Sequence, residues 1–465
     1  MKKYVLSLFL MTLMLALPFS AEGEALSTSE KITAVKEQIK PPSFPNRTFN
    51  VKRYGAAGDG KSDSTAAFKK AIEAANKAGG GRVVVPPGTY VTGAIYLKSN
   101  VNLHIMKKAT IKFSQNPDKY LPAVLTRWEG VELYNYSPLI YAYNEKNIAI
   151  TGEGTLDGQG DNEHWWPWKG KKEFGWKEGE PNQQQDRDLL FKMAEEKVPV
   201  KERVFGKGHY LRPSFIQPYH SKNIMIKGVT ILNSPMWQIN PVLSENILID
   251  DVKIIGHGPN NDGVDPESSK NVLIKDSYFD NGDDCIAIKS GRNADGRRIN
   301  VPSENIIIEG NQMKDGHGGV VIGSEISGSV RNVFAQYNVM DSPNLDRALR
   351  IKTNSVRGGT IEDIDFSNNT VKSVGSEVIQ IDMYYEEGDT GNFTPVVRNI
   401  NIENLQSNGG KYGVWIRAYE RSPVTNLTIR HSNFQHVAMP LLMENVKNPV
   451  FEEFCINGSC MNTNR

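Results

Sequence analysis

The chain has 465 residues, with 54 lysines and arginines against 53 aspartates and glutamates, and a formal net charge of +1. A content of 39% hydrophobic and 9% aromatic residues is typical of a folded protein with a large core and excludes a disordered chain. Because the basic residues are balanced by acids and no nucleic-acid-reading motif occurs, no nucleic-acid partner is expected; the sequence predicts no oligomeric state.

The first 25 residues have the pattern of an export signal. Lys2 and Lys3 precede an apolar run over residues 4–17, and small residues suited to cleavage follow. The run is shorter than the roughly 20 residues needed to span a bilayer, which disfavours the alternative of an uncleaved anchor. We expect a secreted protein, periplasmic if the source has an outer membrane, that does not contact the membrane after residues 1–25 are removed. Residues 26–47, with mixed charge and prolines, are expected to be a loosely held leader.

Residues 48–465 are expected to form one domain that begins with a capping helix. An N-cap at residues 63–65 precedes apolar residues at helical spacing up to residue 75, and glycines at 79–81 separate them from a strand at 83–85. Such a helix would cover the first coil of a solenoid, which otherwise exposes apolar core and strand edges.

A short phrase then recurs, an asparagine followed by an apolar triplet. Its repeat is about 22 to 25 residues, stretched to about 35 where loops are inserted. The asparagines are Asn147, Asn223, Asn246, Asn271, Asn305, Asn399 and Asn426. Short β-branched strands at this period predict an all-β, single-stranded, right-handed parallel β-helix, and hairpin signals typical of a sandwich do not dominate.

Two insertions interrupt the repeat. Residues 157–213 carry Trp165 and Trp166 with several lysines, which suit the faces and charges of an anionic sugar chain. We expect this insertion to close one end of a groove; the alternative is a flap that only packs. A second insertion, residues 290–298, brings Arg292 next to the acidic residues described below.

Three aspartates lie on consecutive repeats. Asp262 precedes Asp283 and Asp284 by one coil, so the parallel stack brings their side chains to one face, about 4.8 Å apart. Clustered carboxylates can hold a water and keep one proton for a glycosidic oxygen. The alternative is that these residues only turn the corners of the coils.

Cationic and imidazole groups follow on the next coils. His317 lies between two glycines, and Arg350 and Lys352 alternate on one strand, so that both cations face the same side. Cations facing a carboxylate cluster suit a substrate that is itself an acid, although salt bridges that merely neutralise the acids are an open alternative.

The three cysteines are too few for a disulfide scaffold. Cys455 and Cys460 can close a small C-terminal loop in an oxidising compartment, and Cys285 is expected to be a buried structural thiol. The sequence has no CxxC or histidine-rich metal signature, so neither a metal nor a cofactor is expected.

The order of these motifs resembles glycoside hydrolase family 28, the polygalacturonases, over nearly the whole secreted chain. The four motifs are Asn260-Asn261-Asp262, Gly282-Asp283-Asp284, Gly316-His317-Gly318 and Arg350-Ile351-Lys352. Asn261 replaces the usual threonine, and a second Gly-His-Gly around His257 lies earlier than the family motif; His257 is expected near the site.

The resemblance implies a role for each residue. Asp283 would be the general acid, Asp262 and Asp284 would activate the water, and His317 would support the acid. Arg350 and Lys352 would hold the galacturonate carboxylate, and a tyrosine in a later coil is expected near the site, with Tyr384 preferred over Tyr385.

The implied reaction is inverting hydrolysis of α-1,4-galacturonosidic bonds in polygalacturonate or its oligomers. The two insertions, and residues 127–130 and 318–325, resemble the exo-acting bacterial branch, which implies release of mono- or digalacturonate from a chain end. Endo-acting polygalacturonases and rhamnogalacturonan hydrolases are alternatives within the family. A calcium-dependent pectate lyase and a non-catalytic polysaccharide-binding solenoid are alternatives from other classes.

Overall fold

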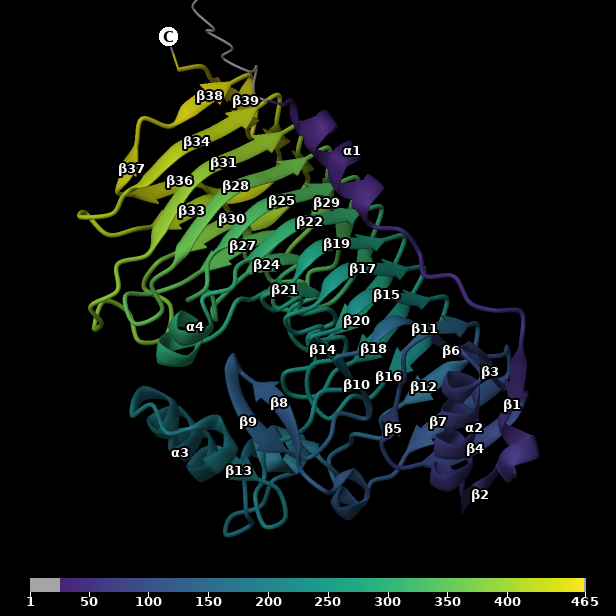
Figure 1. The fold of residues 1–465 in the computed structure, drawn as a ribbon. Helices are drawn as coiled ribbons and strands as arrows, with labels where there is room; N and C mark the ends of the chain where they lie inside the picture. Colours follow the sequence, from purple (N-terminus) through teal and green to yellow (C-terminus); the bar gives the residue numbers. More distant parts are fainter. Residues whose placement is uncertain (1–25, 464–465) are drawn as a thin grey trace, which may run out of the picture.

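Short strands stack in parallel, coil upon coil, into an elongated β-helix (Figure 1). This computed structural model describes residues 26–463; the predicted signal, residues 1–25, lies outside them. The predicted all-β parallel solenoid is confirmed. Within residues 26–463, no helix is long and apolar enough to cross a membrane.

One long sheet contains the strands that the asparagine phrase predicted. In chain order they are β1 (Thr48–Asn50), β3 (Gly81–Val85), β6 (Val101–Ile105), β11 (Lys146–Gly152), β15 (Lys222–Lys227), β17 (Glu245–Asp250), β19 (Lys270–Lys275), β22 (Ser303–Glu309), β25 (Val330–Gln336), β28 (Thr360–Ser367), β31 (Val396–Glu403), β34 (Val424–Arg430), β37 (Val446–Lys447) and β38 (Val450–Glu452).

A second long sheet follows the first on every coil. Its strands are β2 (Asp59–Asp63), β4 (Gly88–Thr92), β7 (Ala109–Phe113), β12 (Thr155–Asp157), β16 (Thr230–Leu232), β18 (Lys253–Gly256), β20 (Tyr278–Asn281), β23 (Gln312–Met313), β26 (Val339–Asp341), β29 (Thr370–Ser373), β32 (Gln406–Ser407), β35 (Asn433–Phe434), β39 (Phe454–Ile456) and β40 (Ser459–Met461).

The third face is built from two shorter sheets linked by isolated bridges. They contain β5 (Ile95–Tyr96), β10 (Ile140–Tyr143) and β14 (Ile216–Tyr219), then β21 (Ile286–Ile288), β24 (Val320–Ile322), β27 (Leu349–Lys352), β30 (Glu377–Asp382), β33 (Gly410–Arg417) and β36 (Val437–Glu444). Outside the solenoid, the hairpin β8 (Val124–Trp128) and β9 (Val131–Asn135) pairs with β13 (Val204–Phe205).

Each recurring asparagine turns a corner and bonds to the coil before it. Asn246 has a φ of 57°, in the left-handed region that asparagine tolerates. Its side-chain amide donates to Asn223 at 3.1 Å and accepts from Asn271 at 3.1 Å, while Asn305 continues the row. This ladder satisfies the polar corner of every coil and fixes the register of the stack.

Both ends of the solenoid are covered. Helix α2 (Thr65–Lys77) packs against β1 and β3, as the sequence predicted, with Ser64 at its N-cap and the carboxylate of Asp63 accepting from the Thr65 backbone. At the other end, the antiparallel pair β39 and β40 carries the Cys455–Cys460 disulfide, which confirms that expectation. Cys285 is a buried free thiol, also as expected.

The prediction of a loosely held leader is wrong for helix α1 (Thr28–Gln38). The helix lies along the outside of the first long sheet (Figure 1), where Ile32 and Val35 are buried in a cluster with Leu248 and Leu273. In each triplet the first and third apolar residues face the core, whereas the middle one faces outward. Where those outward residues are large and apolar, α1 removes them from water.

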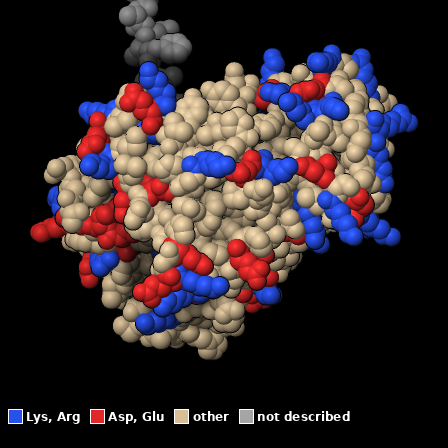
Figure 2. Space-filling view, turned by 90° about the horizontal axis from the view of Figure 1, so that it is seen from below, with Lys and Arg blue, Asp and Glu red and all other residues tan. Residues whose placement is uncertain are grey.

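The remaining helices lie in segments between strands, and the first of them packs against α2 and β3. They are η1 (Val51–Tyr54), η2 (Pro117–Tyr120), η3 (Trp166–Lys169), η4 (Lys172–Phe174), α3 (Gln184–Glu195), η5 (Val200–Glu202) and α4 (Asn293–Ile299). Figure 1 shows α3, α4 and the β8–β9 hairpin on one side of the solenoid. Acidic and basic side chains both occur across the face shown in Figure 2, in keeping with the balanced composition.

Candidate active site

A pocket of about 360 Å³ lies between the third face of the solenoid and the projecting insertions. It is lined by Glu129, Lys169, Gly170, Lys171, Gln183, Gln184, Arg187, Trp237, Asn260, Asp262, Asp283, Lys289, Arg292, Ser324, Glu325, Lys352, Tyr385 and Glu386. Of the predicted site residues, Asp262, Asp283, Arg292 and Lys352 line it directly.

The three predicted aspartates converge. Asp262 follows β18, and Asp283 and Asp284 follow β20 one coil later, so parallel stacking brings the two turns side by side. One carboxylate oxygen from each residue lies within 4.8 Å of the others. Asp262 and Asp284 are buried, whereas Asp283 is half-buried.

Asn261 holds the turn that presents Asp262. Its side-chain oxygen accepts from the Gly258 backbone at 3.0 Å, and its amide donates to the carbonyls of Ser234 and Met236 at 3.0 and 3.1 Å. The residue is fully buried, so it orients the backbone and leaves the carboxylate of Asp262 to the pocket.

The two predicted cations pair with Asp284. Lys352 Nζ lies 2.7 Å from its Oδ2, and Arg350 reaches its Oδ1 at 3.5 Å while donating to Gln380 at 3.1 Å. The alternation predicted for the strand is correct, since both residues lie on β27 and face the acids. The salt bridges weighed as an alternative are therefore present, and Lys352 in addition lines the pocket.

His317 bonds to Asp283, with Nδ1 and Oδ1 3.0 Å apart. This hydrogen bond and the carboxylate charge raise the pKa of His317 to about 9. Burial favours the neutral form of Asp283, but the bond and charge of His317 outweigh it and lower the pKa of that carboxyl below its usual range. The glycines beside His317 serve packing: a Cβ at Gly316 would lie 2.6 Å from the Asp283 carbonyl oxygen.

Asp262 has the opposite environment. Burial, together with the charge of Asp283, raises the pKa of Asp262 to about 8. Its neighbour Asp265 is completely buried, and burial with the charge of Asp262 raises the pKa of Asp265 well above the usual value. The ammonium of Lys289 lies 3.7 Å from both carboxylates and 3.3 Å from that of Glu325.

The preference for Tyr384 is wrong. Its ring packs against Tyr419 and beneath the guanidinium of Arg417, away from the pocket. Tyr385 lines the pocket instead, with Lys352 Nζ 5.3 Å and Arg350 5.4 Å from its ring centre. Both tyrosines lie in the turn that follows β30, and of the two only Tyr385 is among the residues that line the pocket.

Trp165 and Trp166 do not reach the pocket, contrary to the prediction. Trp165 is 2% exposed and packs against Tyr120 and Trp168. The indole of Trp166 donates to the Ser234 carbonyl at 2.9 Å. Both rings anchor the insertion to the solenoid, where apolar packing is available to them.

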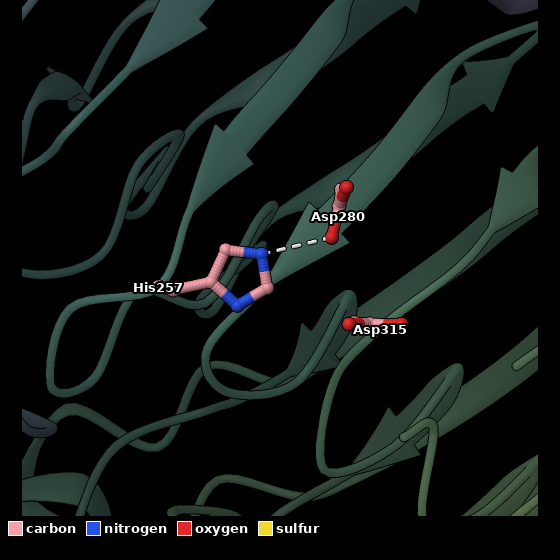
Figure 3. A group of neighbouring side chains, drawn as sticks. All are labelled: His257, Asp280 and Asp315. Atoms are coloured by element: carbon pink, nitrogen blue, oxygen red, sulfur yellow. Dashed lines mark hydrogen bonds and ion pairs between the residues drawn. The ribbon is translucent and has the colours of Figure 1, made fainter. Parts of the chain in front are cut away.

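His257 also lies outside the pocket lining. It is exposed and forms a group with Asp280 and Asp315 (Figure 3), its Nε2 lying 2.8 Å from Asp280 Oδ1. Asp315 accepts from Ser342 at 2.5 Å and from Asn344 at 3.3 Å. The spacing would admit a metal ion, as it would at Asp262, Asp283 and Asp284, and we assign no metal to either group.

The long insertion supplies a charged wall of the pocket, to which Arg187 belongs although the sequence patterns did not single it out. Arg187 on α3 bonds to Glu129 at 2.9 Å, and Lys169 donates to Asn260 at 2.9 Å. Arg292 bonds to Glu325 at 3.1 Å, which links the second insertion to the same wall. The signal available in the sequence was that these charges lie within the inserted segments.

Comparisons with known proteins agree with this geometry. A family model described as "Glycosyl hydrolases family 28" matches residues 205–395, and one described as "Rhamnogalacturonase A/epimerase, pectate lyase-like" matches residues 48–118. The crystal structure of a hyperthermoactive exopolygalacturonase from Thermotoga maritima is similar with a TM-score of 0.91 and 51% identity, over 93% of this chain and 97% of that one.

Two curated relatives extend the likeness. An exo-poly-α-D-galacturonosidase of Dickeya chrysanthemi is 29% identical over 414 residues, 83% of this chain and 66% of that enzyme. An endo-polygalacturonase of Pectobacterium carotovorum is 30% identical over 362 residues, 75% of this chain and 79% of that enzyme.

Proposed function

The chain belongs to family 28 of the glycosyl hydrolases, and from that premise we propose that it hydrolyses α-1,4-galacturonosidic bonds of polygalacturonate or its oligomers from a chain end. The observation that carries the proposal is the pocket in which Asp262 and Asp283 face Lys352 and Lys289. Clustered carboxylates of the kind that cleave a glycosidic bond lie beside cations that can bind the carboxylate of a sugar acid.

We assign the proton donation to Asp283 acting with His317. In the free enzyme the pair carries its proton on the imidazole, because the pKa of His317 is raised and that of Asp283 is lowered. During cleavage the proton of the His317 imidazolium moves to Asp283, and Asp283 donates it to the glycosidic oxygen, which leaves His317 neutral and Asp283 ionised. Asp283 lines the pocket and is only half-buried, which gives a substrate oxygen access to its carboxyl.

We assign the activation of water to Asp262 and Asp284. Lys352 and Arg350 offset the charge of Asp284, which is completely buried. Lys352 also reaches the pocket, where together with Arg292 it suits the carboxylate of a galacturonate residue. The ring of Tyr385 beside Lys352 offers an apolar face for the sugar.

Exo action is supported by the insertion that walls the pocket and by the likeness to the Thermotoga maritima exopolygalacturonase. Lys169, Gln183 and Arg187 come from the insertion, so the groove is bounded by charged groups where an open cleft would let a long chain pass. A bounded groove releases one or two sugars from the end of the chain.

Inversion is the outcome that the family resemblance implies, and it needs a test of its own. The carboxylate oxygens lie within 4.8 Å of one another, closer than the roughly 6.5–9.5 Å usual between the two acids of inverting enzymes. Proton NMR of the first product at early times reports its anomeric form: a β product from the α bond supports inversion, and an α product contradicts it.

The deciding experiment is to incubate the mature protein with polygalacturonate in chelator, with D283N as control. We expect reducing ends to increase without new ultraviolet absorbance, a slow loss of viscosity, and only mono- or digalacturonate as early products. Rapid loss of viscosity with mixed oligomers would identify an endo-enzyme. New absorbance that requires calcium would identify a lyase, and cleavage of rhamnogalacturonan alone would identify that activity.

Export is part of the proposal, with residues 1–25 as its signal. Expression of the full chain in a bacterial host, followed by fractionation and N-terminal sequencing, is expected to give extracellular or periplasmic protein cleaved near residue 25. Full-length protein held in the membrane fraction would contradict this assignment.

A further inference from the structure

Asp265 is a buried acid close to the active site. The proposed reaction gives this residue no role. The bridges from Val264 to Ile286 and from Glu267 to Lys289 put Asp265 one coil before Ala287. Through Ala287 and Val321 it shares a column of side chains with Arg350, on the side of the sheet that faces the acids. Its side chain is completely buried and lies outside the pocket lining, three residues after Asp262 on the same coil.

The carboxyl of Asp265 lacks donors. Within residues 26–463, no hydrogen-bond donor reaches either of its oxygens. The Lys289 ammonium stands 3.7 Å away and is shared with Asp262 and Glu325, so one cation faces three buried carboxyls. An ionised carboxylate without donors costs far more free energy to bury than a neutral carboxyl at the same place.

A neutral Asp265 has an O–H group that needs an acceptor. The carboxyl of Asp262 shares the Lys289 ammonium with Asp265, 3.7 Å from each, and is the carboxyl that opens to the pocket. A side-chain hydrogen bond between the two acids is one cause of the raised pKa of Asp265. We propose that Asp265 is a positioning residue that stays protonated and donates its O–H to Asp262, which keeps the Asp262 carboxyl aimed at the attacking water. This inference rests on the proposed hydrolytic function, in which Asp262 helps to activate that water.

The charges around the pair support this arrangement. Burial, then the charge of Asp262, raises the pKa of Asp265; burial, then the charge of Asp283, raises the pKa of Asp262 to about 8, and Asp284 acts in the same sense on both. Lys289 opposes these effects at both carboxyls, and Lys352 does so at Asp262. The pair therefore holds a proton at neutral pH, and the carboxyl that lacks donors retains it.

The test compares D265N with D265A. Asparagine keeps an N–H donor and cannot be charged, so D265N should retain kcat within about fivefold, whereas D265A should lower kcat about a hundredfold with KM changed less than about threefold. If Asp265 is instead an ionised partner of Lys289, D265N will be as impaired as D265A. Full activity of both variants would overturn any positioning role.

Two further measurements keep the result decisive. Should D265A fail to fold, D265L fills the buried volume without a donor and takes its place, and the comparison of D265N with the wild type still separates a neutral from an ionised Asp265. Infrared spectra at neutral pH should show a protonated-carboxyl C=O band that D265N lacks. An unchanged band in D265N would overturn the proposal without reference to activity. If the wild type shows the band but cleaves no polygalacturonate, only the proposed function is refuted.

Discussion

The Nζ atom of Lys352 lies 2.7 Å from Oδ2 of Asp284, and both side chains are buried. Replacing Lys352 by alanine leaves this carboxylate with Arg350 alone, at 3.5 Å. We expect K352A to raise KM, to lower kcat, and to reduce the free energy of unfolding by about 3 kcal/mol, since one partner of a buried ion pair is removed. Urea unfolding and steady-state kinetics measure these effects.

The matched control is Lys207→Ala, whose exposed pair with Asp118 at 3.5 Å should contribute less than about 1 kcal/mol. Unchanged KM and stability in K352A would show that the cation neither binds the substrate nor compensates Asp284.

The three aspartates should be separately required for turnover. D262N, D283N and D284N are each expected to lower kcat about a thousandfold, because each removes a group that donates a proton or activates water. Reducing-end assays measure the loss, and circular dichroism with thermal melting shows whether the fold persists. A variant that stays folded and active would remove that residue from the mechanism.

The pKa of His317 should report its bond to Asp283. NMR titration of the wild type is expected to give a pKa of about 9, and D283N should return it toward about 6.5. Because the folded-state pKa is raised, the stability from this bond is complete below about pH 6.5 and is lost as the pH rises through about 9.

Thermal melting across that range should therefore show the wild type losing an advantage over D283N with increasing pH. An ordinary His317 pKa in the wild type would contradict the hydrogen bond in solution.

The two adjacent tyrosines should differ in function. Tyr385 lines the pocket beside Lys352, so Y385A is expected to raise KM about tenfold through loss of the ring that the cations and the sugar share. Tyr384 packs on Tyr419 outside the pocket, so Y384A should keep KM near the wild-type value even if it melts earlier. Equal effects on KM would mean that the pocket extends beyond Tyr385.

Helix α1 should contribute to stability. Val35 is buried against the outer face of the first long sheet, so V35D is expected to reduce the free energy of unfolding by about 3 kcal/mol, since an uncompensated charge replaces an apolar contact. Ala34→Asp on the exposed face of the same helix is the control and should change it by less than about 0.5 kcal/mol. Equal stability of the two variants would show that α1 does not dock in solution.

Much of the molecule follows from local sequence. The asparagine phrase predicts the strands of the first sheet because a corner that needs a left-handed residue and an alternating apolar triplet must recur on every coil. The same period brings Asp262 beside Asp283 and Asp284, and the alternation on β27 brings Arg350 and Lys352 to one side. Because the sequence repeats once per coil, the position of a residue within the repeat determines both its column along the solenoid and the face on which it lies. These two determinants bring the acidic side chains together.

Tertiary structure alone decided which residues of the inserted and turn segments face the pocket, because these segments do not follow the repeat of the coils. Trp165 looks like a sugar platform in sequence yet is 2% exposed, and Tyr385 faces the acids where Tyr384 does not. Whether a side chain of an inserted segment faces a pocket or the solenoid depends on contacts with distant coils. The lack of a hydrogen-bond donor at Asp265, among the residues that the structure describes, is of the same kind, since burial and hydrogen bonding at one position are set by residues from several coils at once.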